Sequence, residues 1–234
     1  EVAATAGTSG VVYGVSCSLS PDPKSRVNSF AHVNHTAAAK RIGVLLCING
    51  TGILNSWLRK TMGAGISYEA MNELASKVGV GSEGVLVYPF GNGAERVLEN
   101  ANPGAEIKGL SLTTHGQGNI FRAAQEGIAF SFRYGVDIMS AMGIEAKVVR
   151  AGKANMFLSP IFRQTMANVL NARIELYDTD GALGAARGAA VGAGLYKNAA
   201  EAFSTLKCLD VIEPDNNKEQ VDDIYNVWKN NLKF

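Results

Sequence analysis

The chain is predicted to form one α/β domain over residues 1–234, built on a mixed β-sheet with helices packed against it. Two observations predict this class. Three strand-like segments, at residues 10–16, 27–33 and 41–48, precede the first helical pattern and predict an opening three-strand meander. From residue 119 onward, helical and strand patterns alternate, which is typical of strands joined by crossover helices.

The first half of the chain contains the opening strands, two helices and one further strand. Residues 41–48 (RIGVLLCI) form a nearly continuous apolar run, which is typical of a strand buried on both faces. Helices are expected at about residues 52–62 and 67–78, and a strand at 85–90. A polar, glycine-rich loop is expected from there to about residue 118.

The second half begins with a long amphipathic helix that Gly143 is well placed to end. Its apolar side chains recur at three- and four-residue steps, at Phe121, Ala124, Ile128, Phe132, Val136 and Met139. Strands are then predicted at residues 146–149 and 173–177, and helices at 159–170, 182–196 and 221–232. Ser159 and Pro160 suit the N-cap and the first position of their helix.

Three glycines stand four residues apart in the predicted helix 182–196 and form a strip without side chains: Gly184, Gly188 and Gly192. Each glycine costs about 1 kcal/mol of helix propensity relative to alanine. We therefore expect the strip to pack closely on the sheet or on a neighbouring helix. Arg187 interrupts the segment and argues against a membrane helix.

Composition and charge exclude several classes of partner. The net charge is +1 and the pI about 7.9, so neither a nucleic-acid partner nor a membrane-surface partner is expected. Three widely spaced cysteines, Cys17, Cys47 and Cys208, do not form a disulfide framework and indicate a reducing, cytoplasmic compartment. No apolar run reaches the roughly 20 residues that span a bilayer, and no signal peptide pattern is present.

Three short motifs are better explained by structure than by ligand binding. Residues 79–84 match GxGxxG, but they follow a predicted helix and precede a strand, the reverse of a dinucleotide-binding turn. His32 and His35 lack a third partner at metal-site spacing. Asp178 and Asp180 resemble the start of a calcium loop without its later ligands, so Asp180 is interpreted as a helix cap. No metal site is predicted.

Two glycine-bearing turns are candidates for nucleotide binding. Residues 7–10 (GTSG) precede a strand, and their backbone N–H groups and hydroxyls suit a phosphate. Residues 150–157 (RAGKANMF) follow a strand and precede a helix, where a nucleoside can lie across the backbone. Taken singly, each turn is more typical of an ordinary hairpin or loop.

In this order and at this separation, the turns resemble those of the FGGY carbohydrate kinases, xylulokinases most of all. The resemblance covers residues 1 to about 200 and rests on six ordered matches. These are residues 6–11 (AGTSGV); 28–32, 42–46 and 57–59 (NSFAH, IGVLL, WLR); 87–90 with 93–96 (VYPF, GAER); 126–129 (EGIA); 150–162 followed by Arg163-Gln164; and 184–189 (GAARGA).

The resemblance implies an actin-like, ribonuclease-H-like domain that binds ATP with Mg²⁺. It also implies a second domain of the same fold, so that the cleft between the two domains phosphorylates a sugar hydroxyl. The nucleotide-binding residues that the resemblance implies are Gly7 and Thr8 for the β- and γ-phosphates, with Ser9 in the same turn. Gly52 and Asn55 would line the α-phosphate and ribose, and Ala151, Gly152 and Asn155 would hold adenosine.

Two departures from the family limit what carries over. The family's glycine cluster reads Ala151-Gly152-Lys153 here, in a longer turn, which shifts the adenine contacts by about one position toward Met156. The family's catalytic Asp, its first phosphate turn and most sugar contacts lie upstream of residues 6–11. We therefore expect no catalytic residue in this chain, which would be the ATP-binding half of a D-xylulose kinase whose N-terminal domain binds the sugar.

Three alternatives stay open at this stage. The substrate of the whole kinase could be another family sugar or polyol, such as ribulose, gluconate or glycerol. The chain could instead be a non-catalytic nucleotide-binding module of the actin-like class, or a domain without activity of its own. ATP and ADP are the expected small-molecule partners, and a homodimer is left open.

Overall fold

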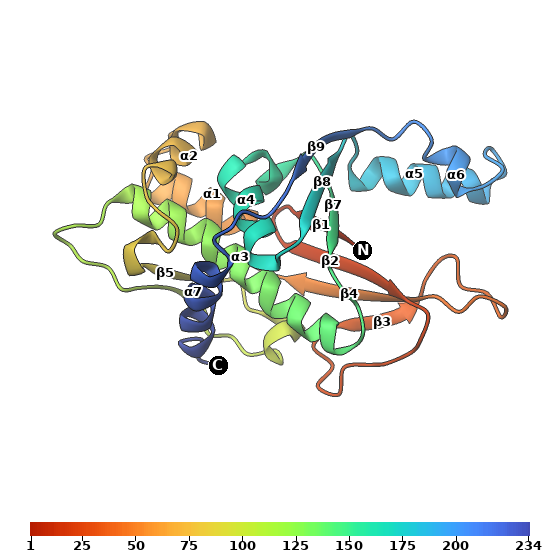
Figure 1. Cartoon of the computed structure of the whole chain (residues 1–234), viewed down its shortest axis with the longest axis horizontal. Helices are drawn as coiled ribbons and strands as arrows, with labels where there is room; N and C mark the ends of the chain where they lie inside the picture. The colour runs from red at the N-terminus through yellow and green to blue at the C-terminus, as the bar shows by residue number, and fades with distance from the viewer.

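The computed structural model describes residues 1–234 and is built around one seven-stranded mixed sheet (Figure 1). The strands are β1 (Val2–Ala6), β2 (Gly10–Ser16), β3 (Asn28–Ala31), β4 (Ile42–Ile48), β7 (Val148–Gly152), β8 (Arg173–Tyr177) and β9 (Cys208–Ile212). Their order across the sheet is β3-β4-β2-β1-β7-β8-β9. The predicted α/β class, a mixed sheet with helices packed on it, is confirmed.

Strand β1 is an element that sequence analysis missed. Its sequence, VAATA, is short and rich in alanine, which has low strand propensity. It pairs antiparallel with β2 and parallel with β7, which places it at the centre of the sheet. The chain therefore opens with four strands rather than three. Strands β1, β2 and β4 are neighbours, and β3 lies on the outer edge of β4.

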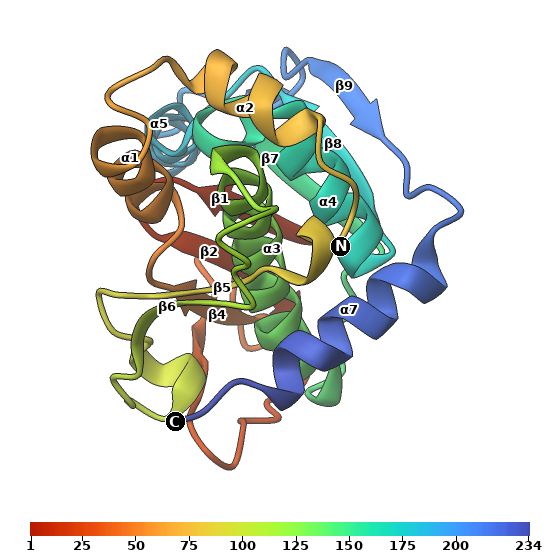
Figure 2. The same ribbon diagram turned by 90° about the vertical axis from the view of Figure 1, so that its left-hand side faces the viewer.

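Helices α3 (Gln117–Ala141) and α4 (Pro160–Leu170) cover one face of the sheet (Figure 2). Helix α3 is buried over most of its length because α1 (Gly52–Thr61), α2 (Tyr68–Ser76) and α4 pack against its other sides. Two predicted helix boundaries, the start of α4 and the end of α3, are confirmed. The Ser159 hydroxyl accepts a hydrogen bond from the N–H of Phe162, and Gly143 adopts a φ of +85° just beyond α3.

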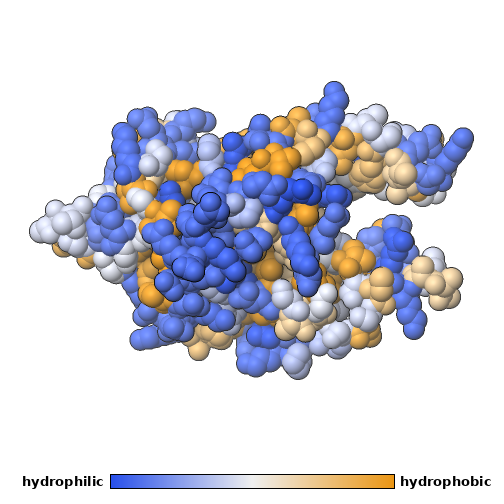
Figure 3. Space-filling view, viewed as in Figure 1, coloured by the Kyte–Doolittle hydropathy of each residue, from blue (hydrophilic) through white to orange (hydrophobic).

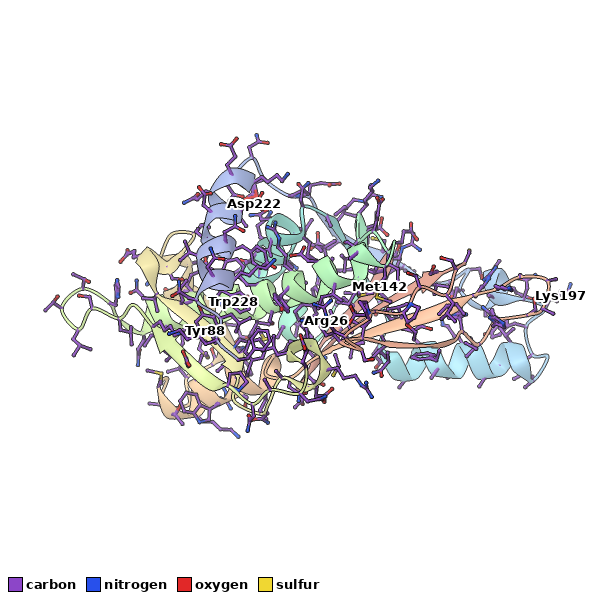
Figure 4. The ribbon with its side chains drawn as sticks, turned by 90° about the horizontal axis from the view of Figure 1, so that it is seen from below. Arg26, Tyr88, Met142, Lys197, Asp222 and Trp228 are labelled. Carbon is purple, nitrogen blue, oxygen red and sulfur yellow. The ribbon has the colours of Figure 1, made fainter.

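A two-stranded ribbon and the C-terminal helix complete the core. Strand β5 (Leu86–Phe90) pairs with β6 (Gly104–Lys108), a strand inside the segment that was expected to be a loop. Helix α7 (Lys218–Asn230) lies across this ribbon, and the fully buried Trp228 donates from Nε1 to the carbonyl of Val87 at 2.9 Å. Figure 4 shows Trp228 beside Tyr88, whose ring centroid is 5.1 Å away. The predicted terminal amphipathic helix is confirmed.

Helix α5 (Gly181–Gly192) and helix α6 (Ala199–Ala202) form the α5–α6 arm, which extends away from the body of the molecule (Figure 1). No residue of α5 is buried. A Cβ built on Gly184, Gly188 or Gly192 would meet no atom within 4 Å. The expectation that the glycine strip packs on the sheet or on a helix of this chain is wrong, because the strip faces open space and α6, which does contact α5, does not cover it.

A buried carboxylate explains the GxGxxG match at residues 79–84. Glu126 of α3 is 3% exposed. It accepts hydrogen bonds from the N–H of Gly81 at 3.0 Å, the hydroxyl of Ser82 at 2.8 Å and Nε of Arg122 at 2.8 Å. Gly81 has a φ of +88°, a conformation that favours glycine. The structural interpretation of this motif is confirmed.

Replacing Glu126 with alanine should lower the free energy of unfolding by about 3–5 kcal/mol, because a largely buried guanidinium loses its only ion-pair partner. Urea unfolding followed by circular dichroism measures this loss. Glu73 is the control, since it pairs with Lys77 on the exposed surface of α2. Glu73→Ala should change stability by less than about 1 kcal/mol. Equal losses for the two variants would contradict the role assigned to Glu126.

Candidate functional site

Four strand ends meet at one edge of the sheet, here called the carboxyl edge. Strands β1, β7 and β8 are parallel, and β4 runs in the same direction as β1 because each is antiparallel to β2. Sheets of this kind bind ligands outside the carboxyl ends of their strands. The segments that follow these strands carry residues 7–9, 49–52, 153–155 and 178–181, which include most of the residues that the family resemblance singles out.

The carbonyl groups of the β1–β2 turn face the start of α1. The carbonyl of Gly7 accepts hydrogen bonds from the N–H of Gly52 and from the hydroxyl of Thr51, each at 2.8 Å. The carbonyl of Thr8 accepts from the N–H of Ile53 at 3.2 Å and from the same hydroxyl at 3.1 Å. A carbonyl oxygen has two lone pairs, so both carbonyls are fully used.

The donor groups of the same turn are free. The N–H groups of residues 7–9 and the hydroxyls of Thr8 and Ser9 make no hydrogen bond within the chain. Thr8 is exposed and Ser9 is partly exposed. The turn thus offers solvent several donors while its first two carbonyls point into the protein. Successive free N–H groups of this kind form an anion-binding surface.

The segment after β7 reaches the β1–β2 turn. A Cβ built on Gly7 would lie 3.8 Å from Nδ2 of Asn155. Asn155 is exposed, has a φ of +53°, and its side chain makes no hydrogen bond. The parallel register of β1 and β7, with Ala4 opposite Ala151, sets this approach. The prediction that the two turns converge within the length of one nucleotide is confirmed.

Ala151 and Gly152 lie in β7 rather than in a turn, which corrects the predicted strand at residues 146–149. The strand is shifted because its parallel pairing with β8 continues to the pair Gly152–Tyr177. Ala151 is buried. A Cβ built on Gly152 would lie 2.2 Å from the carbonyl oxygen of Thr179, so the backbones after β7 and β8 are in contact there.

A pocket of about 390 Å³ lies next to the carboxyl edge. Ala3 and Thr5 line it, and they alternate along β1 with residues buried under the helices, so the pocket is on the sheet face that α3 and α4 leave open. Its wall includes three of the residues predicted for adenosine: Ala151, Gly152 and Asn155. In Figure 3 a notch on the right separates the α5–α6 arm from the side of the molecule where β2 and β3 end and β4 begins.

The far wall of this pocket was not predicted from the sequence; it is formed by Tyr177, Thr179, Gly181 and Leu206 together with Asp180. A signal was present, because four of these residues end or follow a correctly predicted parallel strand, β8. Asp180 was assigned only as a helix cap, and that assignment is confirmed. Its carboxylate accepts a hydrogen bond from the N–H of Leu183 at 2.8 Å.

Gly52 and Asn55 lie beside the pocket rather than in its wall. The N–H of Gly52 is already bound to Gly7, and a Cβ on Gly52 would lie 2.5 Å from the same carbonyl oxygen. Gly52 therefore allows α1 to approach the turn. Asn55 follows one helical turn later, is partly buried, and makes no side-chain hydrogen bond. Their contacts with a nucleotide stay a prediction.

The charged groups of the pocket are already engaged. Nε of Arg150 donates to Oε2 of Glu175 at 3.1 Å, and the hydroxyl of Tyr177 donates to the same oxygen at 2.8 Å. The Tyr177 hydroxyl, together with Arg150, holds the pKa of Glu175 below its usual range. The other charged residue of the pocket wall, Asp180, caps α5. The wall thus provides binding groups rather than an unpaired acid or base.

No group of three or more His, Cys, Asp or Glu side chains in the chain is arranged to hold a metal ion. Nδ1 of His32 accepts a hydrogen bond from the N–H of Asn34, and Nδ1 of His35 accepts one from the N–H of Arg41, so both rings stabilise the loop before β4. None of the helices combines the length and the apolar character that a membrane span requires.

The chain has the actin-like ATPase fold, which it shares with the solved sugar kinases that it resembles. The chain belongs to the FGGY family of carbohydrate kinases, whose C-terminal domain matches residues 2–194. The matched region includes the β1–β2 turn, the segment after β7 and helix α5.

Several proteins similar to this chain are called xylulose kinases. The chain is 31% identical to a xylulose kinase of Lactococcus lactis over 95% of its own length and 44% of the relative's. It is also 31% identical to a xylulose kinase of Escherichia coli, over 86% and 40% of the two lengths. A solved xylulose kinase from Rhodospirillum rubrum superposes with a TM-score of 0.84 at 24% identity, over 98% of this chain and 46% of that one. The chain thus spans less than half the length of these relatives.

Adding one methyl group at two glycines should have opposite effects. Gly152→Ala should lower the free energy of unfolding by about 1–3 kcal/mol, because its Cβ collides with a backbone carbonyl that must move. Gly184→Ala, in open space on α5, should raise it by about 0.5–1 kcal/mol through helix propensity. Urea unfolding compares the two. A stable Gly152→Ala protein would contradict the backbone contact at the carboxyl edge.

Proposed function

We propose that this chain is the ATP-binding half of a sugar kinase that phosphorylates D-xylulose. One observation carries the proposal. The β1–β2 turn points its first two carbonyls inward and leaves its donors free, and a Cβ built on Gly7 would lie 3.8 Å from Nδ2 of Asn155 in the segment after β7. Phosphates bind at such donors, and a nucleoside extends from there toward Asn155 and the pocket.

The choice of sugar is supported by the names of the relatives. Relatives called xylulose kinases, at 30–32% identity, come from several bacteria. A gluconokinase at 26% identity over 186 residues and a ribulokinase at 33% identity over 160 residues keep the alternative sugars open.

ATP is the proposed nucleotide, and a solved glycerol kinase from Plasmodium falciparum, which is similar in fold, contains ADP. Magnesium is the proposed metal. Mg²⁺ is usually held by substrate phosphates, waters and one or two carboxylates. Because this chain has no group of three metal-binding side chains, we assign no metal ligand in it. Its three free cysteines suit a reducing cytoplasm.

A second domain is proposed to cover the open side of this one. The relatives are more than twice as long as the segment matched here. The α5–α6 arm and the sheet face that carries Ala3, Thr5 and Tyr13 have no partner in the chain. A helix with such an apolar sequence is normally buried. By resemblance, the second domain would bring the catalytic Asp and most sugar contacts; a homodimer stays a prediction.

The chain on its own should bind ATP with a dissociation constant on the order of 1 mM. It should release no ADP with xylulose, gluconate or glycerol, because removal of a general base costs roughly 10²–10⁴ in rate and the loss of a bound sugar costs more. Calorimetric titration and a coupled ADP-release assay measure these outcomes. Sugar-dependent ADP release that Thr8→Val abolishes would show that the chain holds a complete active site and would refute the two-domain proposal.

A further inference from the structure

Thr51 occupies an unusual position between β4 and α1. It stands at the N-cap of α1 and is fully buried, yet its side chain does not cap the helix. An N-cap threonine normally accepts a hydrogen bond from an N–H in the first turn of its helix. Here the hydroxyl donates instead, to the carbonyls of Gly7 at 2.8 Å and Thr8 at 3.1 Å.

The first N–H groups of α1 go to the same two carbonyls. Those of Gly52 and Ile53 lie 2.8 Å and 3.2 Å from the carbonyls of Gly7 and Thr8. Helix N-termini often bind anions directly. At the start of α1, the N–H groups of Gly52 and Ile53 cannot bind an anion directly, because both already donate to carbonyls of the turn. The first turn of α1 therefore stabilises the β1–β2 turn, and the N–H groups of the β1–β2 turn are the ones that remain available to a ligand.

The orientation of the two carbonyls matters electrostatically. A carbonyl oxygen that faced a phosphate would repel it, and peptide planes that turn their oxygens inward present their N–H groups outward. The glycines around Thr51 make this packing possible. A Cβ on Gly10 would lie 2.8 Å from Cγ2 of Thr51, and one on Gly52 would lie 2.5 Å from the oxygen of Gly7.

We infer that Thr51 is the positioning residue of the β1–β2 turn: its buried hydroxyl keeps the carbonyls of Gly7 and Thr8 inward, so that the N–H groups of Thr8 and Ser9, which share peptide planes with those carbonyls, bind nucleotide phosphates. The inference rests on the proposed function. It assigns to Thr51 no contact with the nucleotide. Replacing Thr51 should therefore weaken the binding of a ligand that carries phosphates and should leave the binding of the nucleoside alone unchanged.

The experiment compares ATP with adenosine on the wild-type chain and on Thr51→Val, which keeps the shape of the side chain and removes the donor. Amide NMR titration gives both dissociation constants. Thr51→Val should weaken ATP binding roughly ten-fold, the equivalent of a lost hydrogen bond. Adenosine binding should change less than about two-fold, since the nucleoside contacts lie after β7. Thr51→Ser should restore ATP binding.

Thr51→Ser and Thr51→Ala form a second pair of variants, which differ only in the hydroxyl. This pair replaces the first comparison if Thr51→Val does not fold. A merely structural role would weaken ATP and adenosine equally in the variants that lack the hydroxyl, and that result would overturn the inference. So would unchanged ATP binding in Thr51→Val. Absence of ATP binding by the wild-type chain would instead overturn the proposed function, and the inference with it.

Discussion

Strand β1 pairs antiparallel with β2 on one side and parallel with β7 on the other. The whole site depends on this change of direction at the centre of the sheet. The hairpin to β2 produces a tight turn at the carboxyl edge, and the parallel neighbour ends beside that turn. With a purely antiparallel sheet, the segment after β7 would leave at the opposite edge. One strand of five residues thus places the turn of residues 7–9 next to Asn155.

Glycine allows the elements at this edge to pack closely. Gly10, Gly52 and Gly152 each lie where a Cβ would come within 3 Å of another group. A side chain at any of these places would separate the elements that form the site. Glycine has a different effect in α5. Gly184 faces open space, so it lowers the stability of the helix without allowing another element to pack closer.

Most of the fold could be predicted from the sequence because its helices and central strands carry strong periodic signals. Strands β2, β4 and β8 and helices α1 to α4 are where the pattern places them. Strand β1 could not be predicted, since alanines carry no strand signal and the sheet imposes the conformation from both sides. The site residues came from the resemblance. The role of Thr51 is a long-range contact with Gly7 and Thr8 that no local pattern encodes.

The α5–α6 arm has a consequence for communication within the protein. Helix α5 begins at Asp180 and Gly181, which form part of the pocket wall, and it ends far from the body of the molecule, where Lys197 marks the tip (Figure 4). The same helix therefore joins the wall of the pocket to a point far from the body of the molecule. A partner that holds the outer end would therefore also restrain the pocket wall, because Asp180 and Gly181 belong to both the wall and the start of the helix.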